Sequence, residues 1–364
     1  MRARTTTAGT APLLQTASGN DYTNFRGAQL GGTTPAFDSA ADKDRDGYLN
    51  DREYATRRAG SDARFLYQSR LFYPTYGPMR FAANVSSTAY QAWAADYHLR
   101  YLQTQPNANG FFVDNSTGKI AVDPTTLRES MATYAVDYGA LLGAVNRRIA
   151  PRWLVANTAG AGASGEPIAQ NGVSTLEEFG LRPLSTNHVQ LDDLVATLAY
   201  RRQLSGGKAY EILDSLPQGK DASDPRVQLT TLAMYYLVAD PNLSFLMMNG
   251  GNEPASGWSR HWTDAITYNV GKPVAALSQF ATGQDPSNRD LTYKVFRREY
   301  QNAIVFYKPL SYTRGTAGTI ADNTATTHQL DGYYRPLKAD GSLGTPVNRI
   351  TIRNGEGITL VKSR

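Results

Sequence analysis

Short apolar runs that alternate with longer helix-like stretches constrain the fold of this chain more than any other feature. Between residues 60 and 310, most of the apolar runs end in a polar or acidic residue. A strand, a polar tip and a helix, repeated roughly five or six times, are typical of βα units that build a parallel sheet. The expected strands are 79–84, 110–115, 153–157, 173–179, 210–214 and 244–249, and the expected helices are 87–102, 123–149, 189–204 and 227–238.

This α/β pattern predicts a TIM-like (β/α) barrel over residues 61–290. In such a barrel the working side chains follow the carboxyl ends of the strands. Only six strands are convincing, so the first two strands of a barrel are missing or disguised within residues 1–75. The chain is then a fragment, or its barrel is incomplete at the N-terminus.

A doubly wound sheet is the alternative, because Gly160, Gly162 and Gly165 have the spacing of a dinucleotide-binding turn. The next apolar run starts at Val173, too soon for a crossover helix of ordinary length. We therefore interpret this glycine-rich stretch as a flexible loop. The helix before it is expected to begin at Asp123, which can cap free amides ahead of Pro124.

The pattern changes after about residue 290, where short strand-like runs are separated by turn signals. Asp340-Gly341 and Asn354-Gly355 are typical hairpin turns, and a further hairpin is expected at Gln301-Asn302. The expected strands are 295–300, 303–307, 332–337, 348–352 and 358–361. Residues 291–364 are therefore predicted to form a C-terminal antiparallel β domain, and residues 1–60 an irregular lead-in.

The lead-in contains a segment, residues 42–53, that matches the twelve-residue EF-hand calcium loop. Gly47 occupies the sixth position, where the loop bends sharply, and Glu53 the twelfth, where a bidentate carboxylate is needed. The expected ligands are Asp42, Asp44, Asp46, the Tyr48 carbonyl, Asn50 and Glu53. Only one such loop is visible, so we expect Ca²⁺ in a structural role; the alternative is an acidic solvated turn.

Several carboxylates lie at or near the ends of the expected strands. Asp114 follows four largely apolar residues, Glu177 and Glu178 lie within the fourth expected strand, and Asp214 ends the fifth. Glycoside hydrolysis needs two such groups, a protonated one for the leaving oxygen and an ionised one that attacks or activates water. Because strand neighbours point to opposite faces, only one of Glu177 and Glu178 can face a cleft. The alternatives are a turn cap for Asp114 and surface charge or an ion pair for the glutamates.

Polar and aromatic side chains beside these carboxylates are expected to bind a sugar. Amides contact hydroxyl groups, and flat rings stack on pyranose faces. The region just past residue 250 is the strongest candidate for such a platform, because Gly, Asn, Pro and two Trp residues gather there. The predicted substrate-binding residues are Asn115, Asn157, Asn249, Glu253, Trp258 and Trp262.

Composition and missing motifs exclude other classes of protein. The chain has no Cys, so disulfides, thiol catalysis and Cys-ligated zinc are excluded. Lys and Arg never form a run of four despite the net charge of +5, so a nucleic-acid partner is not expected. Without an apolar run of about 18 residues, no membrane span is expected. Neither a Gly-x-Ser-x-Gly elbow nor a phosphate-binding P-loop is present.

Three segments together resemble the TIM-barrel glycosyl hydrolases of environmental bacteria. They are residues 111–116, residues 176–179, and the tail with 295–307, 333–337 and 352–357. The resemblance covers about residues 60–364. It implies that Asp114 is the nucleophile, that Glu177 or Glu178 is the general acid, and that a β-sandwich-like C-terminal domain packs on the barrel.

The function expected from these observations is a glycoside hydrolase that cleaves a polysaccharide or oligosaccharide. The alternatives are a non-catalytic, calcium-stabilised carbohydrate-binding or cell-surface protein, and a polysaccharide lyase with a Tyr or Lys base. Calcium and sugar chemistry favour an extracellular or cell-surface location. The first seven residues carry positive charge but no apolar run, so no signal peptide is expected there, which counts against that location. The sequence predicts no particular oligomeric state.

Overall fold

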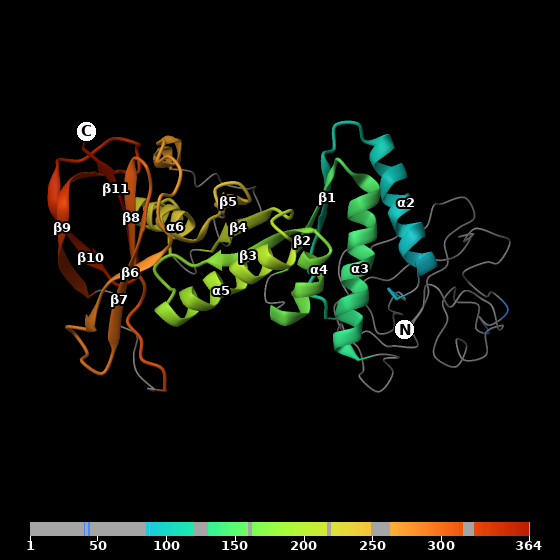
Figure 1. Ribbon diagram of the computed structural model, residues 1–364, viewed down its shortest axis with the longest axis horizontal. Coiled ribbons are helices and arrows are strands. Elements are labelled where there is room, and N and C mark those ends of the chain that lie inside the picture. Colours follow the sequence, from blue (N-terminus) through green and yellow to red (C-terminus); the bar gives the residue numbers. More distant parts are fainter. Residues whose placement is uncertain are drawn as a thin grey trace. The chain divides into compact units, whose positions relative to one another are not determined.

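The computed structural model describes residues 40, 43, 85–86, 88–119, 130–158, 162–216, 220–248, 263–315 and 324–363 (Figure 1). Contacts divide the chain into two units. Unit 1 comprises Met1–Leu176 and Arg201–Ala209, and unit 2 comprises Glu177–Tyr200 and Tyr210–Arg364. Each unit is described by itself. The predicted strand 79–84 lies outside the described residues.

A five-stranded sheet has the strand order β1-β2-β3-β4-β5. Its strands are β1 (Gly110–Val113), β2 (Trp153–Asn157), β3 (Ser174–Leu181), β4 (Glu211–Ser215) and β5 (Ser244–Met248). The pairs β1–β2, β2–β3 and β4–β5 are parallel. All five strands match strands expected from the sequence. Their order runs along the chain without the reversal that a doubly wound sheet requires, so that alternative is wrong for the described strands.

Helices connect the strands and largely match the expected segments. They are α2 (Thr88–Thr104), α3 (Met131–Ile149), α4 (Glu166–Gln170), α5 (His188–Leu204) and α6 (Pro225–Val238), with 3₁₀ turns η2 (Gly162–Gly165) and η3 (Asp264–Thr267). Within the described ranges, no helix combines the length and apolar character that a membrane crossing needs.

Two expectations about these helices are wrong. Helix α3 does not run continuously from Asp123, because Ser130 has extended backbone and its hydroxyl accepts from Thr133 N at 3.1 Å, which caps the helix. Asp123 itself lies outside the described residues. The glycine-rich stretch is not a loop throughout, since η2 and α4 occupy Gly162–Gln170 and lead into β3.

The core of unit 1 lies around α3. Helix α2 runs beside α3 (Figure 1), and the rings of Tyr90, Tyr134 and Tyr138 are almost fully buried. Helix α4 packs closely on α3 at Gly139, where a Cβ atom would lie 2.7 Å from the Pro167 carbonyl carbon. Glycine is needed at this position because any side chain would push the two helices apart.

The C-terminal part of unit 2 is one curled antiparallel sheet with the order β10-β9-β11-β8-β7-β6 (Figure 1). Its strands are β6 (Ser278–Gln284), β7 (Thr292–Glu299), β8 (Ala303–Lys308), β9 (Ala325–Pro336), β10 (Val347–Arg353) and β11 (Glu356–Lys362). The hairpin at Gln301-Asn302 and the turns at Gly341 and Gly355 are confirmed. The described strands form a single sheet instead of the two facing sheets of the expected β-sandwich, and β6 was not predicted.

Helix α6 packs against the antiparallel sheet and shares its core. Buried residues of α6, among them Leu232 and Met234, belong to one apolar cluster with Leu213 of β4 and with Val305 of β8. A Cβ atom on Gly357 of β11 would lie only 2.4 Å from the Ala233 Cβ atom, so the helix and the strand are in close contact. This core places the ends of β3 and β4 on a firmly packed support within unit 2.

Candidate active site at the strand ends

The first candidate group lies at the carboxyl ends of β1 and β2 in unit 1. Asp114 directly follows β1, and Asn157 is the last residue of β2. Parallel pairing sets Val113 opposite Ala156, so the next residue on each strand lies side by side. The Asn157 side chain donates from Nδ2 to Asp114 Oδ1 at 2.9 Å. The structure therefore brings together two residues that the sequence separates by 43 positions.

Asp114 receives two further hydrogen bonds from its own turn. The Asn115 amide donates to Oδ1 at 2.8 Å, and Asn115 Nδ2 donates to Oδ2 at 3.0 Å. All three donors are N–H groups, which suit an ionised carboxylate because that form only accepts. The side chain is exposed, whereas Asn157 is buried with 2% of its surface accessible. The arrangement presents an oriented anion to solvent.

Buried hydrogen bonds hold the turn that follows β1 and carries Asp114. Asn115 has φ of 51°, in the left-handed region that Asn tolerates better than most residues. The fully buried Ser116 donates to the Val113 carbonyl at 3.0 Å and lies 3.3 Å from the Tyr138 hydroxyl on α3. Sequence reasoning missed this support from Tyr138, because the ring lies 22 positions away in the chain.

A buried guanidinium lies next to the end of β2. Thr158, which follows Asn157, donates from its backbone to the Leu176 carbonyl at 2.9 Å, and Arg201 Nη1 donates to Thr158 Oγ1 at 3.2 Å. Arg201 is only 5% exposed. Sequence reasoning missed Arg201 because it lies in the last turn of α5 beside Arg202, and nothing in the sequence distinguishes the two arginines. Its hydrogen bond to Thr158 connects the last turn of α5 to the end of β2, where Asn157 lies.

The second candidate group lies on β3 and β4 in unit 2. Glu177 and Glu178 are half-buried residues of β3, and Asp214 of β4 is 1% exposed. Asp214 Oδ2 accepts from the Phe179 backbone N–H at 3.5 Å, a long and therefore weak hydrogen bond. Asp214 is thus adjacent to the strand that carries both glutamates.

Strand β3 is distorted where these acids lie. Phe179 has φ of 60°, which is rare for an aromatic residue and costs backbone energy. A Cβ atom on Gly180 would lie 2.8 Å from Glu177 Cγ, so the Glu177 side chain lies directly against the strand backbone. Bulges and strained residues in strands concentrate near functional sites, where they change the direction of a side chain.

The remaining predicted residues fall outside the described ranges. This holds for four substrate-binding candidates and for the whole set of calcium ligands: Asn249, Glu253, Trp258 and Trp262, and Asp42, Asp44, Asp46, Tyr48, Asn50 and Glu53. Where the structure describes side chains, no group of three or more His, Asp and Glu residues is arranged for a metal ion. Calcium binding therefore stays a prediction, as do the catalytic and substrate-binding roles.

A second set of titratable groups is buried in the antiparallel part of unit 2. Asp285 accepts from Ser287 N at 2.9 Å, from Ser287 Oγ at 2.7 Å, from Asn354 Nδ2 at 2.7 Å and from the Ser311 hydroxyl. Burial alone would raise the pKa of Asp285, but these hydrogen bonds outweigh it and hold the pKa well below its usual value. Burial lowers the pKa of Lys308 to about 8. Since every oxygen of Asp285 is occupied, this cluster serves structure.

Comparison with protein-family models and with curated proteins finds no match. Among solved structures, endo-glycoceramidase II from Rhodococcus sp., in complex with a cellobiose-like imidazole, is similar with a TM-score of 0.28 and 13% identity over 76% of this chain. The chain spans 64% of the length of that enzyme. A glucosidase from Croceicoccus marinus has a TM-score of 0.31 and 10% identity over 75% of this chain and 73% of its own. Both likenesses are partial, and neither assigns a substrate to this chain.

Proposed function

We propose that this chain is a glycoside hydrolase in which Asp114 is the ionised carboxylate. The observation that carries the proposal is the set of three N–H donors on an exposed Asp114 at a strand end. Sequential strand order supports a (β/α) barrel, in which such a position belongs to the active-site face. The substrate is a polysaccharide or oligosaccharide, and the calcium loop at residues 42–53 is part of the proposal.

The hydrogen bonds define what Asp114 does chemically. The three N–H groups orient the ionised form of the carboxylate, which only accepts hydrogen bonds, and in that form Asp114 acts as nucleophile at the anomeric carbon or as the base that activates water. Asn157 is then a positioning residue, because it touches the carboxylate and fixes its rotamer. The second carboxylate carries a proton and gives it to the leaving oxygen. Glu177, Glu178 and Asp214 are the candidates for that group.

The first test measures release of reducing ends from a panel of polysaccharides in calcium buffer. We expect release by the unaltered chain and none by Asp114→Asn, which keeps the shape of the side chain but not its charge. Asp290→Asn is the matched control, since it makes the same change at an exposed residue between β6 and β7 in the antiparallel part of unit 2. Equal activity of Asp114→Asn and the unaltered chain would refute the role of Asp114.

A second experiment separates the nucleophile from the base. The anomer that the unaltered chain first releases is followed by NMR. Retained configuration is expected if Asp114 is a nucleophile that forms the covalent intermediate, and inverted configuration if Asp114 is the base that activates water. Asp114→Gly with azide and an aryl glycoside then tests Asp114 in either role, because azide attacks from the vacated side and should give a glycosyl azide of inverted configuration.

The general acid is identified by comparing Glu177→Gln, Glu178→Gln and Asp214→Asn on two substrates. Loss of the acid should abolish cleavage of the polymer and spare cleavage of an aryl glycoside with a good leaving group. The other two variants should affect both substrates alike. If no polymer is cleaved by the folded chain but one is bound, the protein is the non-catalytic carbohydrate-binding protein instead.

A further inference from the structure

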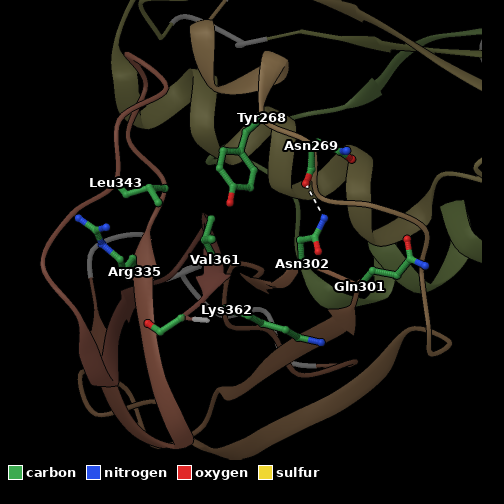
Figure 2. Close-up of a pocket in the computed structure, with 9 residues that line it drawn as sticks. Tyr268, Asn269, Gln301, Asn302, Arg335, Leu343, Val361 and Lys362 are labelled. Atoms are coloured by element: carbon green, nitrogen blue, oxygen red, sulfur yellow. Dashed lines mark hydrogen bonds between the residues drawn. The ribbon is translucent and has the colours of Figure 1, made fainter.

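A pocket of about 710 Å³ opens in the antiparallel part of unit 2 (Figure 2). Its walls come from the loop at residues 268–269, from the hairpin turn between β7 and β8, and from strands β9 and β11. The volume falls within the range of roughly 300–1,000 Å³ that is typical of small-molecule sites. None of the strand-end carboxylates lines this pocket, so it is separate from the candidate active site.

One rim of the pocket is held in place by hydrogen bonds between two loops. The Asn302 amide donates to the Val270 carbonyl at 3.0 Å, and Asn302 Nδ2 donates to the Asn269 carbonyl at 3.1 Å. The Gln301 amide donates to the Lys272 carbonyl at 3.0 Å, and Gln301 Oε1 accepts from Lys272 N at 2.9 Å. A ligand would find this rim already ordered, which reduces the entropy cost of binding.

The loop that contains Asn269 and Lys272 tolerates no larger residue at Gly271, where it meets the turn between β7 and β8. Gly271 has φ of +78°, and a Cβ atom there would lie 2.7 Å from Gln301 Cβ. The close contact explains why the loop approaches Gln301 at a glycine. The hydrogen bonds of this rim use the Gln301 Oε1 and Asn302 Nδ2 atoms. A ligand can therefore accept from Gln301 Nε2 and donate to Asn302 Oδ1.

The opposite rim supplies positive charge. Arg335 on β9 is exposed, and its Nε donates to the Gly344 carbonyl at 3.0 Å, which leaves the two terminal amino groups for a ligand. Lys362 lies between the rims and is paired with Glu299 at 2.7 Å. Among the described residues that line the pocket, none is acidic. The guanidinium fork binds a carboxylate with two parallel hydrogen bonds.

An aromatic ring lies between the two rims. Figure 2 shows the ring of Tyr268 extending into the pocket with its hydroxyl toward Val361, while Arg335 and Gln301 lie on opposite sides of the opening. Tyr268 and Leu343 pack against the core of unit 2, which fixes the ring. A flat apolar surface flanked by an amide on one side and a cation on the other fits a ligand that has C–H faces, hydroxyl groups and a carboxylate.

We propose that this pocket binds an acidic oligosaccharide, a chain of at least two sugar units of which one carries a carboxylate. The carboxylate pairs with Arg335, a sugar ring lies against Tyr268, and the amides of Gln301 and Asn302 bind hydroxyl groups of the next unit. Lys362, whose ammonium is paired with Glu299, adds a second cation to the lining of the pocket. The proposal does not depend on hydrolysis at the strand ends, because its residues belong to the antiparallel sheet and its neighbouring loops.

The test is calorimetric titration with tri-galacturonate, with maltotriose as the uncharged trisaccharide. It is done in the Asp114→Asn background so that neither probe can be consumed, and a hydrolase that failed to appear would leave this result unaffected. We expect tri-galacturonate to bind and maltotriose to bind about tenfold more weakly or not at all. Equal affinity for the two probes, or no binding of tri-galacturonate, would overturn the proposal.

Two variants and a control locate the binding site. Arg335→Gln should weaken tri-galacturonate binding about tenfold or more, and Gln301→Glu should weaken it by placing a negative charge at the other rim. Arg349→Gln removes a charge from exposed β10 outside the pocket and should have no effect. Equal losses in Arg335→Gln and Arg349→Gln would mean unspecific attraction, and displacement of tri-galacturonate by equimolar sulfate would mean a simple anion site. Either result contradicts the proposal.

Discussion

The Asn157 side chain at the end of β2 donates to the Asp114 carboxylate just past the end of β1, with 2.9 Å between Nδ2 and Oδ1. The register Val113↔Ala156 makes this contact follow from the backbone, because the two side chains occupy equivalent positions on adjacent parallel strands. Asn157 is buried and Asp114 is exposed. The amide can therefore orient the anion without limiting its access to a substrate.

Asn157→Asp should disturb Asp114 through its charge. Two neighbouring carboxylates resist simultaneous ionisation, so one pKa of the pair rises. If Asp114 must be ionised for hydrolysis, the acid limb of the pH–rate profile should move to higher pH, and the rate at neutral pH should fall by about tenfold or more. Asn107→Asp, an exposed residue of the same unit, is the control. An unchanged acid limb in Asn157→Asp would contradict the role of this contact.

Local features of the fold were predictable where one short segment contains all the information. Strand β2 has the expected bounds, and the hairpin at Asn354-Gly355 follows from a left-handed glycine in the turn. The start of α3 was not predictable, because Asp123 and Ser130 both satisfy the local rules for a cap. Strand β6 was missed because a polar edge strand with two Gln residues has a weak apolar pattern.

The candidate site was predictable in its residue types and less so in its contacts. Asp114 follows a strand, and that alone places it at a sheet edge. The hydrogen bond from Asn157 depends on the pairing register, and the support from Tyr138 depends on how α3 packs. Neither is encoded in any short spacing. The left-handed backbone of Phe179 was also unpredictable, since no local signal favours φ above zero at an aromatic residue.

Calcium should stabilise the chain through the loop at residues 42–53. We expect added Ca²⁺ to raise the Tm of the unaltered chain, because an ion at 100 times its Kd contributes about 2.7 kcal/mol to the folded state. Glu53→Gln removes the bidentate ligand and should abolish this rise. Asp51→Asn, at a loop position that supplies no ligand, should keep it. Thermal unfolding with Ca²⁺ and with a chelator measures the effect, and an equal response of Glu53→Gln and Asp51→Asn would exclude the EF-hand assignment.

Asp285→Asn should destabilise unit 2 in a pH-dependent way. The carboxylate is fully buried and accepts from Ser287, Ser311 and Asn354, whereas an amide can accept on one side only. Losing these bonds should cost about 2–4 kcal/mol of unfolding free energy at pH 7.

The pH dependence of that cost has a definite sign. The pKa of Asp285 is lower in the folded chain than its ordinary value of 3.8, so its contribution is complete above about pH 5. It is lost as the pH falls below 3.8 toward the folded pKa. Urea unfolding at several pH values should therefore give a constant difference from pH 5 to 7 that narrows below about pH 4. Asp290→Asn, an exposed residue of the same loop, should show no such dependence, and a difference that widened in acid would contradict the expectation.

Arg298 should be worth more to stability than any exposed arginine of the same sheet. Its Nη1 donates to the carbonyls of Tyr236, Leu237 and Ala239 at 3.1, 3.2 and 2.6 Å, of which the first two lie in the last turn of α6 and the third is its C-cap. Helix ends leave such carbonyls without partners inside the helix. Arg298→Met keeps the apolar stem and removes the donor, so the unfolding free energy should fall by about 2–3 kcal/mol.

The unfolding free energy of Arg298→Lys should lie between that of the unaltered chain and that of Arg298→Met, because one ammonium cannot reach three carbonyls with the geometry of the guanidinium. The matched control is Arg349→Met on β10, where the side chain is exposed and the change should cost less than about 0.5 kcal/mol. Urea unfolding measures all three variants. Since the carbonyls belong to the helix that packs on β8 and β11, loss of the cap should also increase amide exchange in the last turn of α6 before global unfolding. Equal stability of Arg298→Met and Arg349→Met would show that solvent satisfies these carbonyls as well as Arg298 does.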